Sequence, residues 1–110
     1  MVKQGTIIKI NFNPQSGHEQ TGYRPAVVIS NDVFNEKTKL SIVCPITNTD
    51  KHFPLHIPLD ERTKTTGVIL CEHIKSLDLN SRTFQEVEEL PRDLLEKVIN
   101  IVLAEIEEIK

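Results

Sequence analysis

The sequence predicts a mainly β protein with a C-terminal helix, folded as a small and strongly curved sheet or barrel. Up to Pro91, short apolar runs alternate with polar and turn-forming segments, which is the pattern of many short strands. After Pro91 the apolar spacing becomes that of a helix. A chain of 110 residues is too short for two hydrophobic cores, so we expect one domain over residues 1–110. A curved sheet or barrel would cover the strand edges of so short a chain.

The first strand is expected over residues 6–12. Ile8, Ile10 and Phe12 alternate there with polar residues, as in a strand with one buried face. Residues 13–22 hold a proline, two glycines and no aliphatic residue, which predicts a loop.

The second strand is predicted to be buried on both faces, because residues 25–30 form a β-branched run. Asn31 and Asp32 would close it. Pro45 lacks an amide proton and should restrict the third strand to a sheet edge or place the proline at its end. The third and later strands are expected at residues 40–46, 55–57, 67–74 and, more briefly, 83–87.

A single amphipathic helix should follow these strands and cap the sheet. Pro91 suits the first helical position, where a missing N–H costs nothing, and Asp93 favours the positive end of the helix. The apolar residues of its stripe are Leu94, Leu95, Val98, Ile99, Val102, Leu103, Ile106 and Ile109. A half-open sheet with one helix leaves apolar surface that a second subunit could cover.

The charge is unevenly distributed along the chain. The net charge is −3, yet residues 1–75 hold nine Lys/Arg against seven Asp/Glu, whereas residues 76–110 hold four against nine. The first part can therefore present a locally positive surface to phosphates, although the acidic segment is equally consistent with an ordinary solvated helix.

The cysteines and the hydropathy pattern indicate a cytoplasmic protein. Cys44 and Cys71 lie in apolar runs and are too few for a disulfide framework, so we expect reduced, buried thiols. No stretch of about 18 apolar residues is present, and the first residues do not have the pattern of a signal peptide. We expect no membrane segment.

Two polar segments could carry chemistry. Residues 17–24, GHEQTGYR, bring Arg24 to the mouth of a buried strand, and a guanidinium can hold a phosphate through two parallel hydrogen bonds. The plainer alternative is an ion pair of Arg24 with Glu19 or Asp32. At the end of the third strand, Thr47 begins the polar run TNTD, which alone is ordinary turn chemistry.

Together, these segments resemble the MazF/PemK (Kid-like) family of type II toxins. GHEQTGYRPAVVIS is similar to the family's G-x-E-Q-x-G-x-R-P signature, and PITNT, TTGVILCEHIKSLD and the C-terminal helix follow in the family's order over essentially the whole chain. The resemblance implies an SH3-like curved barrel, a homodimer, and metal-independent, sequence-specific cleavage of single-stranded RNA with no cofactor. It also implies a cognate antitoxin with an acidic C-terminal tail.

The resemblance also implies roles for individual residues. Arg24 and Thr47 match the catalytic positions, and Glu19 matches a loop glutamate that would act as the base. The positions implied to contact RNA are His18, Gln20, Asn48 and Glu72.

The identity of the acid and base stays open among Glu19, His18 and Glu72. Glu72 matches an acidic residue that the Kid branch uses as a general base. That branch has an arginine two residues earlier, where this chain has Leu70, so we expect no acid/base pair at 70 and 72.

Two alternative functions are a non-catalytic SH3-like binding module and a topoisomerase poison.

A metal site is not expected. His52 and His56 have a helical ligand spacing, but Pro54 stands between them and no cysteine is nearby. His56, flanked by Leu55 and Ile57, is expected to face solvent.

Overall fold

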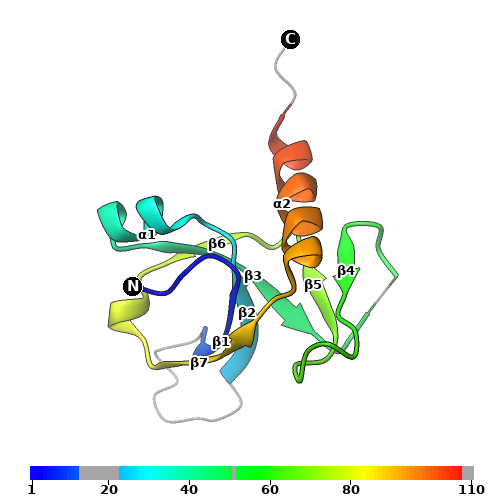
Figure 1. Cartoon of the computed structure of the whole chain (residues 1–110), viewed down its shortest axis with the longest axis horizontal. Helices are drawn as coiled ribbons and strands as arrows, with labels where there is room; N and C mark the ends of the chain where they lie inside the picture. The colour runs from blue at the N-terminus through cyan, green and yellow to red at the C-terminus, as the bar shows by residue number, and fades with distance from the viewer. Residues whose placement is uncertain (13–22, 51, 108–110) are drawn as a thin grey trace.

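The computed structural model describes residues 1–12, 23–50 and 52–107, and shows a seven-stranded antiparallel sheet beside one long helix (Figure 1). The strands follow the order β4-β5-β3-β2-β1-β7, and β6 pairs with β3. The strands are β1 Thr6–Asn11, β2 Tyr23–Val28, β3 Ser41–Thr47, β4 His56–Pro58, β5 Val68–Leu70, β6 Lys75–Leu77 and β7 Phe84–Glu89. The predicted fold class is confirmed, and the strand boundaries differ from those expected by one to a few residues.

The third strand, β3, joins the two halves of the sheet. Its first half, Ser41–Val43, pairs with β6, and its last residues, Ile46 and Thr47, pair with β5. On one edge of β3, Pro45 lies between these two ladders. On the other edge of β3, it opposes Ala26 of β2. A residue without an amide proton is tolerated there because the hydrogen-bonding partner changes at that point.

The single strand expected over residues 67–74 is wrong, because the chain bends in its middle. β5 ends at Leu70, a turn closes with His73 N donating to the Leu70 carbonyl at 3.1 Å, and β6 begins at Lys75. The bend lets consecutive strands pair with different halves of β3. Glu72 consequently lies in a turn and not in a strand.

A short helix, α1 at Asp32–Thr38, follows β2 where only a strand end was expected. Asn31 caps it, because its side-chain oxygen accepts from Phe34 N at 2.8 Å. The fully buried Asn35 anchors the helix by donating to the carbonyls of Val2 and Ser30 at 3.1 and 3.2 Å. The helix has no apolar stripe, so periodicity could not predict it.

Two hydrophobic clusters cover the two faces of the sheet. The first contains Ile7, Val27, Cys44 and Ile46 and packs against the long helix α2, Arg92–Ile106. The second contains the alternate strand residues, namely Ile8, Ile10, Ala26, Val28 and Val43, with Leu77 and Leu79. Leu79 belongs to the 3-10 helix η3, Leu79–Ser81. The predicted burial of the second strand on both faces is therefore confirmed.

The long helix buries only part of its apolar stripe. Pro91 precedes the first helical residue, and Leu94, Val98 and Val102 are buried against the sheet. Near the projecting end of α2 in Figure 1, Leu103 and Ile106 remain 53% and 70% exposed. This end of the helix therefore has apolar surface that none of the described residues covers.

Both cysteines are free and buried, as predicted. Burial raises the pKa of Cys44 and of Cys71 to about 12, so neither is a thiolate at neutral pH.

Within the described residues, the structure has no helix with both the length and the apolarity that a membrane crossing requires.

Candidate functional site

Arg24 and Thr47 lie on neighbouring strands at the same end of the sheet. β2 and β3 pair through Ala26 opposite Pro45 and Val28 opposite Val43. Continuing this antiparallel register by two residues brings Arg24 opposite Thr47. Side chains directly opposite in an antiparallel pair share one face of the sheet, so the guanidinium and the hydroxyl share the face of the second hydrophobic cluster.

The turn after β3 holds Thr47 in place. Thr49 N donates to the Thr47 hydroxyl oxygen at 3.1 Å, which leaves the hydroxyl proton of Thr47 available for another partner. The side-chain oxygen of Asn48 accepts from the Thr66 hydroxyl at 2.9 Å. Gly67, with φ +114°, lies so close that an added Cβ would be 2.3 Å from the Thr47 carbonyl oxygen. Only glycine allows this close approach.

Arg24 is exposed, and within the described ranges no carboxylate lies at ion-pair distance from it. Asp32, one of the two carboxylates considered as a partner, instead accepts from Gln4 N at 2.8 Å. The other, Glu19, lies outside the described residues together with His18 and Gln20. Arg24 can therefore contact an external anion without breaking an ion pair to any described residue.

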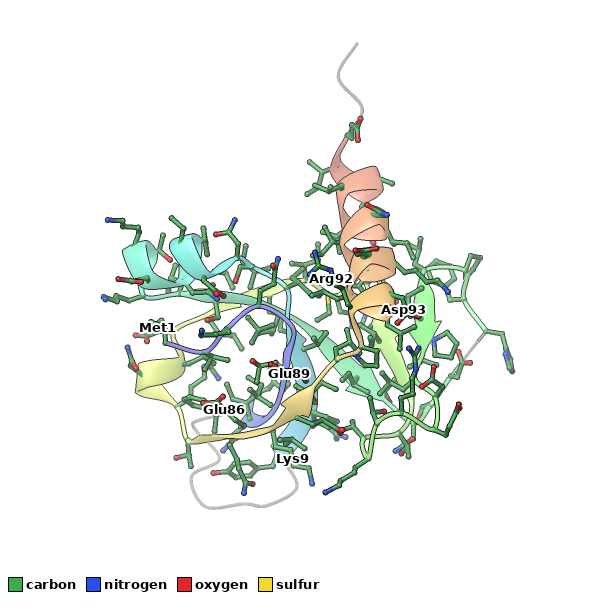
Figure 2. All side chains as sticks on the ribbon, viewed as in Figure 1. Met1, Lys9, Glu86, Glu89, Arg92 and Asp93 are labelled. Atoms are coloured by element: carbon green, nitrogen blue, oxygen red, sulfur yellow. The ribbon has the colours of Figure 1, made fainter. Side chains whose placement is uncertain are left out.

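A groove of about 450 Å³ opens on the other face of the same strand ends. Lys9 on β1 and Pro25 on β2 alternate with Ile10 and Arg24, so they project to the side of the first cluster. Figure 2 labels Lys9 at this end of the sheet. The groove is lined by Lys9, Pro25, Asn48, Lys64, Thr65, Thr66 and Val87.

The segment that carries Lys64 is fixed by a carboxylate on β7. Glu88 accepts from Lys64 N at 3.0 Å, and from Thr65 N and the Thr65 hydroxyl at 2.8 Å each. Burial opposes ionisation of Glu88, but these donors outweigh it and lower its pKa. Neither lysine ammonium forms an ion pair with a described residue. The groove is thus lined by two ammonium groups that no described residue holds in an ion pair.

Glu72 is not free to face a ligand. One carboxylate oxygen lies 2.8 Å from His56 Nε2, and the other is buried without a hydrogen-bond partner. The other ring nitrogen of His56, Nδ1, lies 3.3 Å from Asp50 Oδ1. The expectation of a solvent-facing His56 is wrong, since its side chain is only 8% exposed. The ring lies between two carboxylates, with one at hydrogen-bond distance from each of its nitrogens.

These contacts shift the pKa values of all three groups. Burial alone would lower the pKa of His56, but hydrogen bonds to Glu72 and Asp50 raise it above its usual value. Burial likewise opposes ionisation of Glu72, yet the His56 hydrogen bond lowers its pKa. The pKa of Asp50 is lowered chiefly by the backbone N–H of His52, with a contribution from His56.

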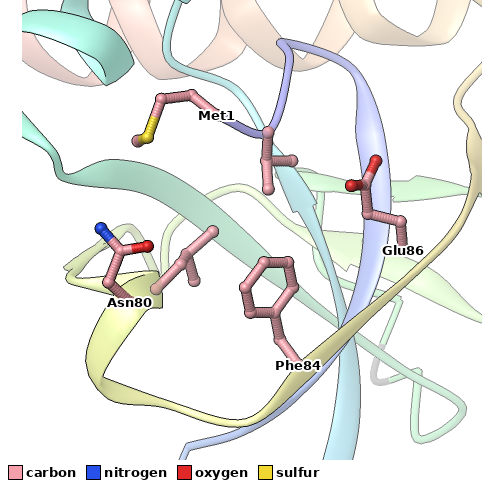
Figure 3. Close-up of a pocket in the computed structure, with 6 residues that line it drawn as sticks. Met1, Asn80, Phe84 and Glu86 are labelled. Carbon is pink, nitrogen blue, oxygen red and sulfur yellow. The ribbon is translucent and has the colours of Figure 1, made fainter.

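Two other features of the described residues suggest no further chemistry. Across residues 1–12, 23–50 and 52–107, no three His, Cys, Asp or Glu side chains are arranged to hold a metal ion. A smaller hollow of about 200 Å³ lies among Met1, Val2, Leu79, Asn80, Phe84 and Glu86 (Figure 3). Its lining comes from the N-terminus, η3 and β7, none of which carries a predicted site residue.

Sequence reasoning missed the His56 contacts and the lysines of the groove. His56 opposes Leu70 in the β4–β5 ladder, which brings its ring near Glu72. That pairing cannot be deduced from a three-residue strand. Lys9 could have been singled out as the charged residue of a strand that leads to the same sheet end as Arg24.

Comparisons with known proteins identify close relatives of this chain. A family model described as PemK-like, MazF-like toxin of type II toxin-antitoxin system matches residues 3–106. The endoribonuclease toxin MazF of Escherichia coli strain K12 is 36% identical over 78 residues, which cover 71% of this chain and 69% of the relative.

Solved structures agree with this match. The crystal structure of MazF from Deinococcus radiodurans has a TM-score of 0.84 and 36% identity, covering 97% of each chain. A MazE-MazF structure from the same organism has a TM-score of 0.83 and 31% identity, again covering 97% of both chains.

Proposed function

Since this chain belongs to the PemK-like, MazF-like toxins of type II toxin–antitoxin systems, we propose that it is an endoribonuclease that cleaves single-stranded RNA without a metal ion. The observation that carries this proposal is the β2–β3 register, which, extended by two residues, brings Arg24 opposite Thr47 on one sheet face. No described carboxylate is paired to the guanidinium. The names of the relatives supply the reaction class.

The reaction uses the nucleophile that RNA itself carries. The 2′-oxygen attacks the adjacent phosphorus, its proton passes to a base, and the 5′-oxygen leaves with a proton from an acid. The products are a 2′,3′-cyclic phosphate and a 5′-hydroxyl end. DNA lacks the 2′-OH and is therefore not cleaved.

Arg24 stabilises the charge that builds on the non-bridging phosphate oxygens. A guanidinium donates two parallel hydrogen bonds and stays charged at every working pH, which suits this role. The hydroxyl proton of Thr47 orients the phosphate or the 2′-OH. Glu19 is the proposed base and His18 the alternative acid or base, and Gln20 is proposed to contact the RNA.

The groove of Lys9 and Lys64 continues the RNA path beyond the cleavage position. Asn48 links the two faces, because it follows Thr47 directly and also lines the groove. Its side-chain oxygen is occupied by Thr66, so its amide N–H groups are the atoms that face a ligand. Ammonium and amide donors fit phosphate and ribose oxygens and require no particular base.

The first test is incubation of the purified protein with a long single-stranded RNA in EDTA, followed by mapping of both new ends. We expect cuts with 2′,3′-cyclic phosphate and 5′-hydroxyl ends, and strongly reduced cleavage by an Arg24→Ala preparation purified identically. Cleavage that requires Mg²⁺ would contradict the metal-independent scheme. No cleavage under either condition would favour a non-catalytic SH3-like binding module.

We propose further that the chain forms a homodimer and is inhibited by a cognate antitoxin in the cytoplasm. The exposed Leu103 and Ile106 support a second subunit on α2, and the similar MazE-MazF structure from Deinococcus radiodurans supports an antitoxin partner. An acidic antitoxin tail would compete with RNA for Arg24 and the lysine groove. Light scattering at micromolar concentration should give twice the 12.5 kDa chain mass, and a monomer would contradict the dimer.

A further inference from the structure

His56 lies on the same sheet face as Thr47, two strands away. In the β4–β5–β3 ladders, Pro58 opposes Val68, which in turn opposes Thr47. His56 is two residues from Pro58, so it projects to the same side. The intervening Ile57 packs against the first hydrophobic cluster on the opposite face. The ring of His56 therefore approaches the site from the edge strand β4.

The ring has a carboxylate at each nitrogen. Nε2 lies 2.8 Å from Glu72 and Nδ1 lies 3.3 Å from Asp50. A neutral imidazole has one N–H and could donate to only one of them, whereas the imidazolium donates to both. With both N–H groups directed at protein carboxylates and the side chain 8% exposed, no proton is left to deliver to a substrate.

Asp50 connects this ring to the Thr47 turn. Its Oδ1 accepts from His52 N at 2.8 Å and from His56, and it lies three residues after Thr47. The same turn contains the hydrogen bond from Thr49 N to the Thr47 hydroxyl. The Thr66–Asn48 hydrogen bond holds the first part of this turn, and the Asp50–His56 contact holds the last part.

We propose that His56, as an imidazolium, is a positioning residue. It bridges the carboxylates of Glu72 and Asp50, and by fixing Asp50 it orients Thr47 in the same turn. This inference rests on the proposed RNA cleavage. It assigns to Glu72 a structural role in place of the RNA contact and base role considered from the sequence. The Kid branch has an arginine at the position of Leu70, which an uncharged leucine cannot replace. His56, which opposes Leu70 in the β4–β5 ladder, provides the positive charge next to Glu72 instead.

The surrounding charges define the pH range of this arrangement. His56 faces Asp50 and Glu72, while His52 lies 3.6 Å from Asp50, His73 lies 3.8 Å from Glu72, and Glu105 on α2 acts on Glu72 through its charge. Because the pKa of His56 is raised in the folded state, its stabilising contribution is complete below its unfolded value of 6.5 and is lost as pH rises through the folded value.

Glu72 sets the acid limit. Its pKa is lowered in the folded state, so its contribution is present above its unfolded value of 4.5 and disappears as pH falls through the folded value. Between these two limits both partners are charged. Activity that depends on the arrangement should therefore decline on the alkaline side as His56 loses its proton.

The test compares His56→Gln, His56→Lys and a control, His52→Asn, in RNA cleavage across pH. Glutamine has no charge and cannot bridge both carboxylates, so kcat should fall by about 10- to 100-fold, the scale of a small misplacement of a reacting group. Binding of the same RNA with a 2′-deoxy group at the cleavage position should change little. Lysine carries a cation with three donors, so it should restore most of kcat and remove the alkaline decline.

The control variant changes the histidine that is 91% exposed and contacts the same Asp50. Asparagine tolerates its left-handed backbone, φ 56°, so cleavage and pH profile should stay as in the wild type. Melting temperatures of all variants identify any that fail to fold. A His56→Gln protein with wild-type kcat, or a His56→Lys protein that keeps the alkaline decline, would overturn the positioning role.

Amide hydrogen exchange of Thr49 and His52 separates this inference from the proposed function. Both amides donate into the turn, and His56→Gln should speed their exchange whether or not the protein cleaves RNA. A wild type that fails to cleave, with faster exchange in the variant, would reject the nuclease and keep the structural link. Unchanged exchange in the variant would reject the link itself.

Discussion

The two faces at the end of β2 and β3 carry positive charge in different ways. On one face, the β2–β3 register, extended by two residues, brings the Arg24 guanidinium opposite the Thr47 hydroxyl. On the other, the ammonium groups of Lys9 and Lys64 line an open groove of about 450 Å³. Alternation along the strands separates the two faces, although Arg24 and Pro25 are adjacent in sequence.

The difference indicates a division of labour. A planar guanidinium opposite a hydroxyl provides fixed directions, which suits the stabilisation of charge on one phosphate. Flexible ammonium groups provide charge with little direction, which suits the retention of a polynucleotide backbone. Changes on the Arg24 face should therefore reduce turnover, and changes on the Lys9 face should reduce affinity.

The largest effect is expected from Arg24→Ala. Loss of the group that stabilises charge in the transition state typically lowers kcat by about 10²–10³-fold. Arg24→Lys should recover little, because an ammonium cannot donate two parallel hydrogen bonds. Single-turnover cleavage, together with a melting curve for each variant, measures this. A folded Arg24→Ala protein with normal kcat would remove the distinction between the faces.

Gly67→Ala should disturb both faces, because this glycine packs under the segment that joins them. The new Cβ would lie 2.3 Å from the Thr47 carbonyl oxygen and 3.1 Å from the Asn48 side-chain oxygen, at a φ of +114°. Strain of this kind costs about 1–3 kcal/mol, before the displacement of Thr47 is counted. Chemical denaturation should show the loss, and both kcat and RNA affinity should fall.

Gly5→Ala is the matched control for this variant. Gly5 also has a positive φ, +91°, but its nearest contact is the flexible end of Leu95 at 3.2 Å. It should lose stability without a separate loss of kcat in the folded protein. Equal kcat losses in the two glycine variants would show that general destabilisation, and not the position of Thr47, limits cleavage.

The sequence predicted one face of this comparison better than the other. The strand run after Pro25 and the helix after Pro91 follow from local patterns, whereas Arg24 and Thr47 were singled out by the resemblance to the toxin family. The β2–β3 register, extended by two residues, brings these two candidates to one face. The groove was not predicted, because Lys64 reaches it only through the hydrogen bonds to Glu88 from a distant strand.

The same limit explains the errors in the fold. The division of the strand expected over residues 67–74 depends on which half of β3 each piece meets, and the contacts of His56 depend on the β4–β5 register. Both depend on long-range strand pairing, and a three-residue strand is too short for its hydrophobic pattern to predict its partner. Helix α1 was missed because its anchor, Asn35, is polar.

Replacing Lys9 and Lys64 together by glutamine should weaken RNA binding without changing kcat. For single strands, each lost phosphate contact makes the negative slope of log affinity against log salt shallower by about 0.7. The slope of the double variant should therefore be shallower by about 1.4. Filter binding of a non-cleavable RNA between low and physiological salt measures the slope. Lys3→Gln with Lys37→Gln removes the same charge from the N-terminal segment and α1. An equal change in this control would mean that net charge, and not the groove, retains the RNA.

The smallest effect is expected from Arg62→Ala, which lies outside both faces. Arg62 joins Asp60 to Asp93 at the start of α2, each at 2.8 Å, and its side chain is 44% exposed. Its hydrogen bonds lower the pKa of both carboxyl groups, so any stability it provides is present above their unfolded value of 3.8 and is lost as pH falls through the folded values. Exposed ion pairs contribute little, so kcat, salt slope and melting temperature near neutral pH should stay close to wild type.

The informative measurement for Arg62→Ala is its melting temperature as a function of pH. The difference from wild type should shrink further towards low pH, where the two aspartates are protonated. A fall in kcat would instead mean that a shift of the loop from Asp60 to Thr66 also displaces Asn48 and Thr47. The separation of the two faces would then depend on this loop as well as on the alternation of the strands.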